Sequence, residues 1–153
     1  MTEQAAKGLA AVLGGDAVFP MPGSRSWGVT LERPDGHFAM IEDSGGWLYR
    51  DRSAMEAFHR DGDNGGLVAA HEWDGWDSGE SWARALAGLI SGEAYQSGGN
   101  IWVVLLSRPD GKFVVVGLDG ADIYQSAAHY EGYYDGNWPE PDFVYWEDSA
   151  AKA

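Results

Sequence analysis

The stretch WGVTLERPDGHF, residues 27–38, returns as WVVLLSRPDGKF, residues 102–113, at a constant offset of 75 positions. The following pairs are identical at this offset: Trp27/Trp102, Val29/Val104, Leu31/Leu106, Arg33/Arg108, Pro34/Pro109, Asp35/Asp110, Gly36/Gly111, Phe38/Phe113, Gly45/Gly120 and Tyr49/Tyr124. Agreement over so short a window indicates two copies of one supersecondary unit. The duplication predicts the architecture of the chain, but it does not indicate a catalytic or binding function.

Each copy is predicted to form a β-hairpin. In Arg33-Pro34-Asp35-Gly36, proline presets the first central residue of a type I turn, aspartate suits the second, and glycine takes the left-handed residue that follows. The flanking residues alternate between apolar and polar, which predicts strands at 27–32 and 37–42. In the second copy, residues 102–106 and 113–116 are apolar on both faces. This pattern predicts that the second hairpin is the more central one.

Helical spacing of apolar residues predicts helices at Thr2–Leu13 and Ser78–Ser91. Thr2 is the expected cap of the first helix, and Asp77 or Ser78 is the expected cap of the second. The remaining expected elements are third strands at 47–50 and 122–125, short helices at 53–60 and 126–133, and last strands at 67–70 and 143–146. The unit is therefore helix, three strands, short helix, strand. It occupies residues 1–76 and again residues 77–153.

This pattern predicts an α+β fold in which two tandem copies build antiparallel sheet with helices packed on it, related by a pseudo-two-fold axis within one compact domain. Each copy leaves one face of its sheet uncovered, so the copies are expected to combine. A continuous sheet and face-to-face packing both satisfy this requirement.

The charge balance is strongly acidic, with 24 acidic and 10 basic residues and a formal net charge of -14. Such a charge opposes direct binding of nucleic acid or anionic membranes and favours a cationic partner. The chain has no cysteine, which excludes disulfides and thiolate sites, and the N-terminal residues lack the layout of a signal peptide. No apolar run approaches the roughly 20 residues needed to span a bilayer. We therefore expect a cytoplasmic protein.

Two short motifs suggest chemistry. The sequence Asp43-Ser44-Gly45-Gly46 resembles the segment around the nucleophilic serine of chymotrypsin-like proteases, but the chain is too short for two barrels, and a tight turn accounts for the glycines. Residues 61–72 place Asp61, Asp63 and Glu72 at positions 1, 3 and 12 of a loop, as in a calcium-binding EF-hand. A ligand side chain is missing at position 5, where Gly65 stands, so a solvated acidic loop is the competing interpretation.

Acidic and aromatic residues gather in two stretches that occupy corresponding places in the two copies. The candidate partner-binding residues of the first stretch are Asp61, Asp63, Glu72, Trp73, Asp74, Trp76, Asp77 and Glu80, and those of the second are Glu131, Tyr134, Asp135, Trp138, Glu140 and Asp142. They are either a solvated face over core aromatics or an acidic docking surface with aromatic anchors.

We expect an acidic, non-enzymatic protein without a cofactor that docks on a basic protein partner, such as a nucleic-acid-binding protein. In a stronger form of this hypothesis, spaced carboxylates imitate a phosphate backbone, and the chain then looks like the small acidic inhibitors of phages and plasmids. The alternative is a calcium-binding module at residues 61–72, or a small-molecule site around Tyr133, Tyr134 and Trp138. A carboxylate-based enzyme is the third hypothesis.

Overall fold

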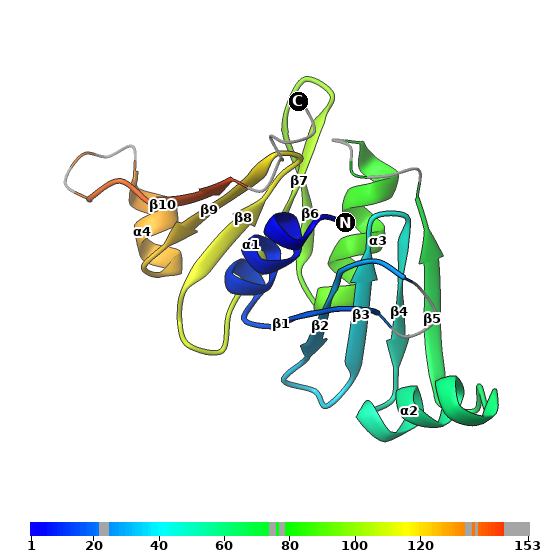
Figure 1. Ribbon diagram of the computed structural model, residues 1–153. Coiled ribbons are helices and arrows are strands. Elements are labelled where there is room, and N and C mark those ends of the chain that lie inside the picture. The colour runs from blue at the N-terminus through cyan, green and yellow to red at the C-terminus, as the bar shows by residue number, and fades with distance from the viewer. Residues whose placement is uncertain (22–24, 74–75, 77–78, 134–135, 137, 146–153) are drawn as a thin grey trace.

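The computed structural model describes residues 1–21, 25–73, 76, 79–133, 136 and 138–145. Within these residues the chain forms four helices and two antiparallel five-stranded sheets (Figure 1). The predicted α+β class is therefore confirmed.

The first half carries α1 (Glu3–Leu13), β1 (Asp16–Val18), β2 (Gly28–Glu32), β3 (Phe38–Glu42), β4 (Gly45–Tyr49), α2 (Arg52–Asp61) and β5 (Leu67–Glu72). The second half carries α3 (Glu80–Ile90), β6 (Glu93–Gly98), β7 (Ile101–Ser107), β8 (Phe113–Val116), β9 (Gly120–Tyr124), α4 (Ala127–Gly132) and β10 (Asp142–Tyr145). The sheets run in the orders β1-β2-β3-β4-β5 and β10-β9-β8-β7-β6. We call them sheet A and sheet B.

Each half has one strand that the sequence did not predict. These strands, β1 and β6, are the first of each sheet and pair only with β2 and β7. β1 is three residues long and lies just before Pro20 and Pro22, and β6 has the largely polar sequence EAYQSG. Neither segment has the apolar alternation of a half-buried strand, because an edge strand is held mainly by backbone hydrogen bonds to one neighbour.

The two predicted hairpins are confirmed. β2 pairs with β3 and β7 with β8, with Leu31 opposite Ala39 and Leu106 opposite Val114. In both turns the glycine has a positive φ, 91° at Gly36 and 93° at Gly111, a conformation that glycine adopts without steric cost.

Three of the helices have a side-chain cap, and the one predicted among these, Thr2 of α1, is confirmed. The Thr2 side chain accepts a hydrogen bond from the Ala5 N–H at 3.0 Å, and the Ser126 hydroxyl accepts one from the His129 N–H at 3.1 Å. The N-cap of α3 is Gly79, without a side-chain hydrogen bond, so the expected start at Ser78 was wrong. The proposed caps Asp77 and Ser78 lie outside the described residues.

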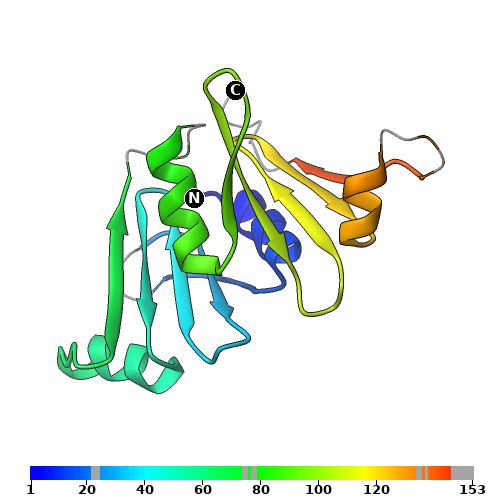
Figure 2. The ribbon, with the colours of Figure 1, turned by 180° about the vertical axis from the view of Figure 1, so that it is seen from behind.

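Two helices lie between the sheets. α1 packs on β1 and β2 and also on β9 and β10, whereas α3 packs on β6 and β7 and also on β3 and β4. α1 faces the viewer in Figure 1 and α3 does so in Figure 2, each bridging the two sheets. One hydrophobic core consequently draws on both halves, with Leu9, Val29, Trp82, Leu86 and Val114 among its buried members.

The second glycine of the Asp-Ser-Gly-Gly motif, Gly46, lies where α3 packs on β4. A Cβ at Gly46 would lie 2.4 Å from the Leu89 Cδ1 of α3, so the absence of a side chain lets the helix of one half approach β4 of the other. The expectation that the second hairpin is the more central one was wrong. β2 and β3 are buried on both faces, whereas β7 and β8 alternate between buried and half-exposed residues.

Candidate functional site

The repeated Arg-Pro-Asp-Gly turn holds the two halves together. Arg33 Nη1 donates to the carbonyl oxygens of Gly88 and Leu89, 2.9 and 3.3 Å away, in the last turn of α3. Arg108 Nη1 donates in the same way to Ala11 and Val12, 3.0 and 3.1 Å away, in the last turn of α1. We call these two contacts the arginine clasps. Each places a cation at the negative end of a helix dipole and binds carbonyls that have no partner within the helix.

An aspartate two residues later orients each arginine. Asp35 accepts from Arg33 Nη2 and Asp110 from Arg108 Nη2, both at 2.6 Å. Desolvation acts to raise the pKa of Asp35, but hydrogen bonds from the His37 N–H and from Arg33 outweigh it and bring this pKa to about 2. The Lys112 N–H and the Arg108 charge likewise lower the pKa of Asp110, against a smaller effect of desolvation. Both carboxylates therefore act as turn and clasp residues.

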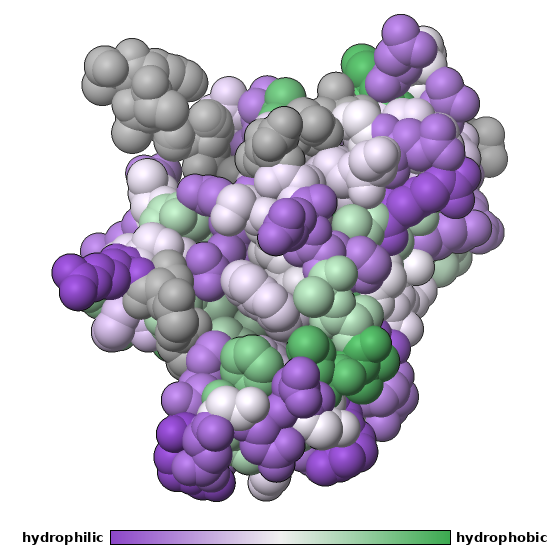
Figure 3. Space-filling model, turned by 90° about the vertical axis from the view of Figure 1, so that its right-hand side faces the viewer, coloured by the Kyte–Doolittle hydropathy of each residue, from purple (hydrophilic) through white to green (hydrophobic). Residues whose placement is uncertain are grey.

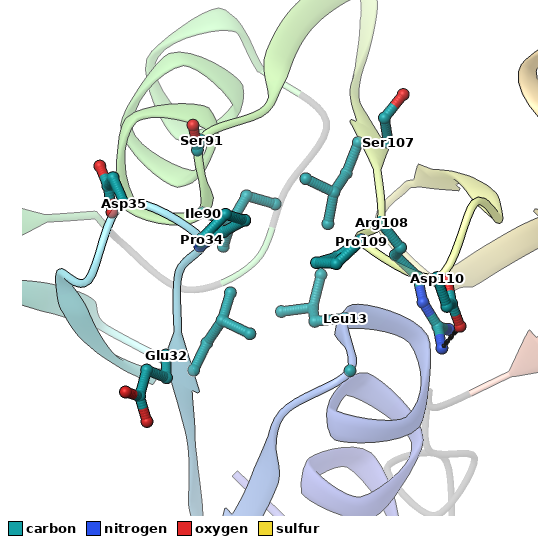
Figure 4. A pocket seen from close by; sticks show the side chains of 13 residues that line it. Leu13, Glu32, Pro34, Asp35, Ile90, Ser91, Ser107, Arg108, Pro109 and Asp110 are labelled. Carbon is teal, nitrogen blue, oxygen red and sulfur yellow. Dashed lines mark hydrogen bonds and ion pairs between the residues drawn. The ribbon is translucent and has the colours of Figure 1, made fainter.

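A pocket of about 400 Å³ lies between the clasps (Figure 4). Its apolar walls come from both halves, with Leu13 and Leu31 from the first and Ile90 and Leu106 from the second. Pro34 and Pro109 of the two turns point into the same space. Of its charged residues, Arg108, Asp35 and Asp110 bind arginine, aspartate or backbone groups of the clasps and turns, whereas Glu32 is exposed. The pocket thus lies at the junction of the halves, where most of its charged groups serve the fold.

The structure divides the first acidic stretch between two ends of strand β5. Asp61 and Asp63 lie before β5, and Glu72 lies at its far end. Asp61, Asp63, Glu72 and Glu80 are exposed, whereas Trp73 is only 9% exposed and donates from its indole nitrogen to the Asp43 carbonyl at 2.6 Å. Trp76 packs on the buried Trp82 with ring centroids 5.1 Å apart. The two tryptophans therefore belong to the core, and Asp74 and Asp77 lie outside the described residues.

The carboxylates that suggested an EF-hand do not converge. Asp61 pairs with Arg60 at 2.9 Å, and Asp63 Oδ1 accepts from the Gly65 N–H at 2.9 Å. Because Leu67–Glu72 is an extended strand, it carries Glu72 away from both aspartates. Within the described ranges, no three acidic or histidine side chains are grouped as metal ligands.

The second acidic stretch does gather exposed acids and exposed aromatics around α4 and β10. Glu131, Glu140 and Asp142 are exposed, and Trp138 is 40% exposed. Phe143 and Tyr145 of β10 are 57% and 54% exposed, with ring centroids 5.5 Å apart. Tyr134 and Asp135 lie outside the described residues. We call Glu131, Trp138, Glu140, Asp142, Phe143 and Tyr145 the C-terminal patch.

The sequence did not single out Phe143 and Tyr145 as site residues. Their alternation with Val144, which packs on the core, is a signal that could have placed both rings on the open face of a half-buried strand.

His129 fixes the segment that carries this patch. Its side chain is 1% exposed, and its Nδ1 accepts from the Gln125 N–H at 3.0 Å. Since Nδ1 is an acceptor, the ring hydrogen lies on Nε2, which donates to the Pro139 carbonyl at 2.6 Å. Trp138 stacks on the imidazole at 5.2 Å between centroids. One buried side chain thus ties α4 to the residues that lead into β10.

We expect His129→Ala to lower the free energy of unfolding by about 2 kcal/mol, because it removes two buried hydrogen bonds and leaves the Gln125 N–H without its acceptor. Urea denaturation measures the change, with His71→Ala on the half-exposed side of β5 as the control, for which a change within about 0.5 kcal/mol is expected. Equal losses in the two variants would contradict the role assigned to His129.

The opposite side of the molecule has a different surface. Figure 3 views it from the side of β5 and α2, where hydrophilic residues surround a hydrophobic area. Val68 of β5 is 52% exposed, and Asp61, Arg60 and Glu56 of α2 are exposed. Acidic and basic side chains alternate on α2, and ion pairs join Arg60 to Asp61 and Arg50 to Asp51. This side is consequently less uniformly acidic than the C-terminal patch.

None of the helices formed by the described residues has the length and apolar character needed to cross a membrane. Comparison of the chain with protein-family models, with curated proteins and with solved structures finds no match.

Proposed function

We propose that this protein is a non-enzymatic binding protein whose acidic surface docks on a basic protein partner. The observation that carries this proposal is the C-terminal patch, where exposed carboxylates and exposed aromatic rings lie on adjacent elements. Aromatic side chains dominate the energetics of protein interfaces, and complementary charge raises the rate and specificity of association.

The distribution of cations supports the same proposal. Arg33 and Arg108 bind helix carbonyls, Lys7 pairs with Glu3, and Arg84 pairs with Glu80. These cations are thereby engaged inside the chain, and the chain as a whole carries a formal net charge of -14, which attracts a basic partner. A nucleic-acid-binding protein is the partner class that we propose first, because its binding channel is already basic.

We also propose that the scaffold is a tandem duplication with a pseudo-two-fold axis between the halves. The common order of elements and the reciprocal arginine clasps support this proposal. The duplication gives the fold its stability, whereas the C-terminal patch belongs to one half.

The docking proposal predicts that a charge-neutral triple variant, Glu131→Gln, Glu140→Gln and Asp142→Asn, binds its partner at least tenfold more weakly. The partner is recovered by pull-down from the native host, and its affinity is then measured with purified proteins at roughly 50 and 300 mM salt. The wild-type affinity should fall steeply with salt because the attraction between exposed charges is screened.

The matched control is Asp16→Asn, Glu32→Gln and Glu56→Gln, which removes the same charge from exposed positions of the first half. Neither triple variant should change stability by more than about 0.5 kcal/mol per site. An affinity that is insensitive to salt, or that falls equally in both triple variants, contradicts docking through the C-terminal patch.

A further inference from the structure

The outer face of sheet B carries apolar side chains that no other element covers among the described residues. Val104, Leu106, Val114 and Val116 are buried in the core, so the alternate residues Val103, Leu105 and Val115 lie on the opposite face and are half-exposed. Phe143 of β10 and Tyr95 of β6 extend the same face, at 57% and 47% exposure. α4 lies over one end of this face, where it packs on β9 near the buried Tyr124 and its Tyr130 stacks on Phe113 of β8 with ring centroids 4.6 Å apart.

The equivalent face of sheet A is covered by the chain itself. Met21 from the β1–β2 connection and Met55 from α2 pack there on Phe38, Met40 and Tyr49. Met21 lies so close to β2 that a Cβ at Gly28 would be 2.5 Å from its Cγ. Gly28 of β2 therefore leaves the space that the Met21 side chain occupies on this face of sheet A.

Sheet B differs at the matching positions. At the offset of 75, Gly28 and Thr30 correspond to Val103 and Leu105, so the uncovered sheet is the more apolar of the two. The β6–β7 connection is a tight hairpin, in which Gly98 pairs with Ile101, and it brings no residue back over the sheet. Exposed apolar patches with polar surroundings are typical of protein interaction sites.

A carboxylate lies in the middle of this face. Asp122 of β9 is opposite Val115 on one side and Phe143 on the other, in the row that begins at Glu93 and Leu105. Burial against these apolar neighbours raises the pKa of the Asp122 carboxyl. The charged form of a half-buried carboxylate is stabilised when a cation approaches it.

The surface is hollowed beside Asp122. A depression of about 260 Å³ is lined by Val103, Val115, Phe143 and two glycines, Gly117 and Gly120, together with the carboxylates Asp119 and Asp122. The Phe143 ring lies over Gly120, since a Cβ there would be 2.9 Å from the ring. The depression therefore offers apolar walls, an aromatic face and two carboxylates, the half-buried Asp122 and the exposed Asp119, a combination that suits the long side chain of an arginine.

We infer that the outer face of sheet B binds a segment of a basic protein partner, with one arginine seated in the depression against Asp122 and apolar neighbours packed on Val103, Leu105 and Val115. This inference rests on the proposed docking function and names the chemistry of the partner. A second copy of this chain is a poor occupant, because symmetric contact would bring acidic faces together and because each chain carries a formal charge of -14.

Site-directed photo-crosslinking tests the inference. A benzoylphenylalanine replaces Phe143, Trp138 or Val68 in the full chain, and the purified proteins are irradiated in an extract of the native host. Position 143 should crosslink to a basic protein, and the crosslinked peptide should contain an arginine within a few residues of apolar side chains. Asp122→Asn, which keeps the shape of the side chain, should lower the yield at position 143 at least fivefold, whereas Glu56→Gln should leave it unchanged.

The three positions separate the possible failures. Crosslinking at 138 without crosslinking at 143 would leave the docking function standing and overturn the arginine site. A crosslink from 143 to a second copy, to a peptide without arginine, or with a yield indifferent to Asp122→Asn would also overturn it. Absence of crosslinks at both 138 and 143 would contradict both proposals, and Val68 on the far side of the molecule reports random collision.

Discussion

Replacing Arg33 and Arg108 together by methionine is expected to lower the free energy of unfolding by about 3 to 6 kcal/mol. Each guanidinium is largely buried, with 11% and 16% of the side chain exposed, and each donates to two carbonyls of a helix in the other half. A hydrogen bond to a charged group contributes about 1.5 to 3 kcal/mol, and the carbonyls left behind lose their partner. Urea denaturation followed by circular dichroism and by tryptophan fluorescence measures the loss.

The control for the clasps is Arg84→Met, which removes an exposed ion pair within α3. We expect it to cost under about 0.5 kcal/mol because exposed pairs of this spacing contribute little. If the double variant behaved like this control, the clasps would be incidental contacts.

The carboxylate in the Arg33 clasp should make the stability of the protein depend on pH. Because the pKa of Asp35 is about 2 in the folded chain and 3.8 in an ordinary environment, its contribution to stability is complete above about pH 4 and is lost as the pH falls toward 2. The stability difference between wild type and Asp35→Asn should therefore shrink over this interval. A difference that stays constant from pH 5 to pH 2 would contradict the assigned role of the carboxylate.

Trp82→Ala is expected to lower the free energy of unfolding by about 3 to 5 kcal/mol, since it removes a large, fully buried side chain and leaves a cavity. Trp82 belongs to the core that both halves share, so the whole chain should still unfold in one transition with a lowered midpoint. Calorimetry and urea denaturation followed by circular dichroism measure both quantities.

Trp82→Phe is the matched variant. The Trp82 indole N–H is buried and has no hydrogen-bond acceptor among the described residues, so phenylalanine removes an unsatisfied donor together with some apolar contact. We expect this variant to lose less than half as much as Trp82→Ala. Different midpoints for fluorescence and for circular dichroism in either variant would show that the halves unfold separately, against a common core.

Much of the local structure could be predicted from the sequence because it depends on neighbouring residues. The turn at Arg33–Gly36, the Thr2 cap and the apolar stripe of α3 are all short-range features, and the structure confirms them. The edge strands β1 and β6 were missed because backbone pairing with a single neighbour leaves little trace in side-chain pattern.

The candidate site was only partly predictable for a different reason. Acidic residues are exposed almost wherever they occur, so Glu131, Glu140 and Asp142 were identified from sequence and are exposed. Tryptophan is compatible with both core and surface, and the pattern could not separate the buried Trp73 from the exposed Trp138. Asp122 was not singled out, because its setting depends on Val115 and Phe143 from neighbouring strands.

The sequence by itself determined the presence of the helices and the hairpins, because these follow from local spacing, and it shows directly the acidic composition and the repeated stretch. Only the tertiary structure decided that Arg33 and Arg108 reach across to the helices of the opposite half. It also decided that Met21 covers one sheet, whereas the described residues leave Val103, Leu105 and Val115 of the other sheet half-exposed. Both depend on which distant residues meet, and that is set by the packing of α1 and α3 between the sheets.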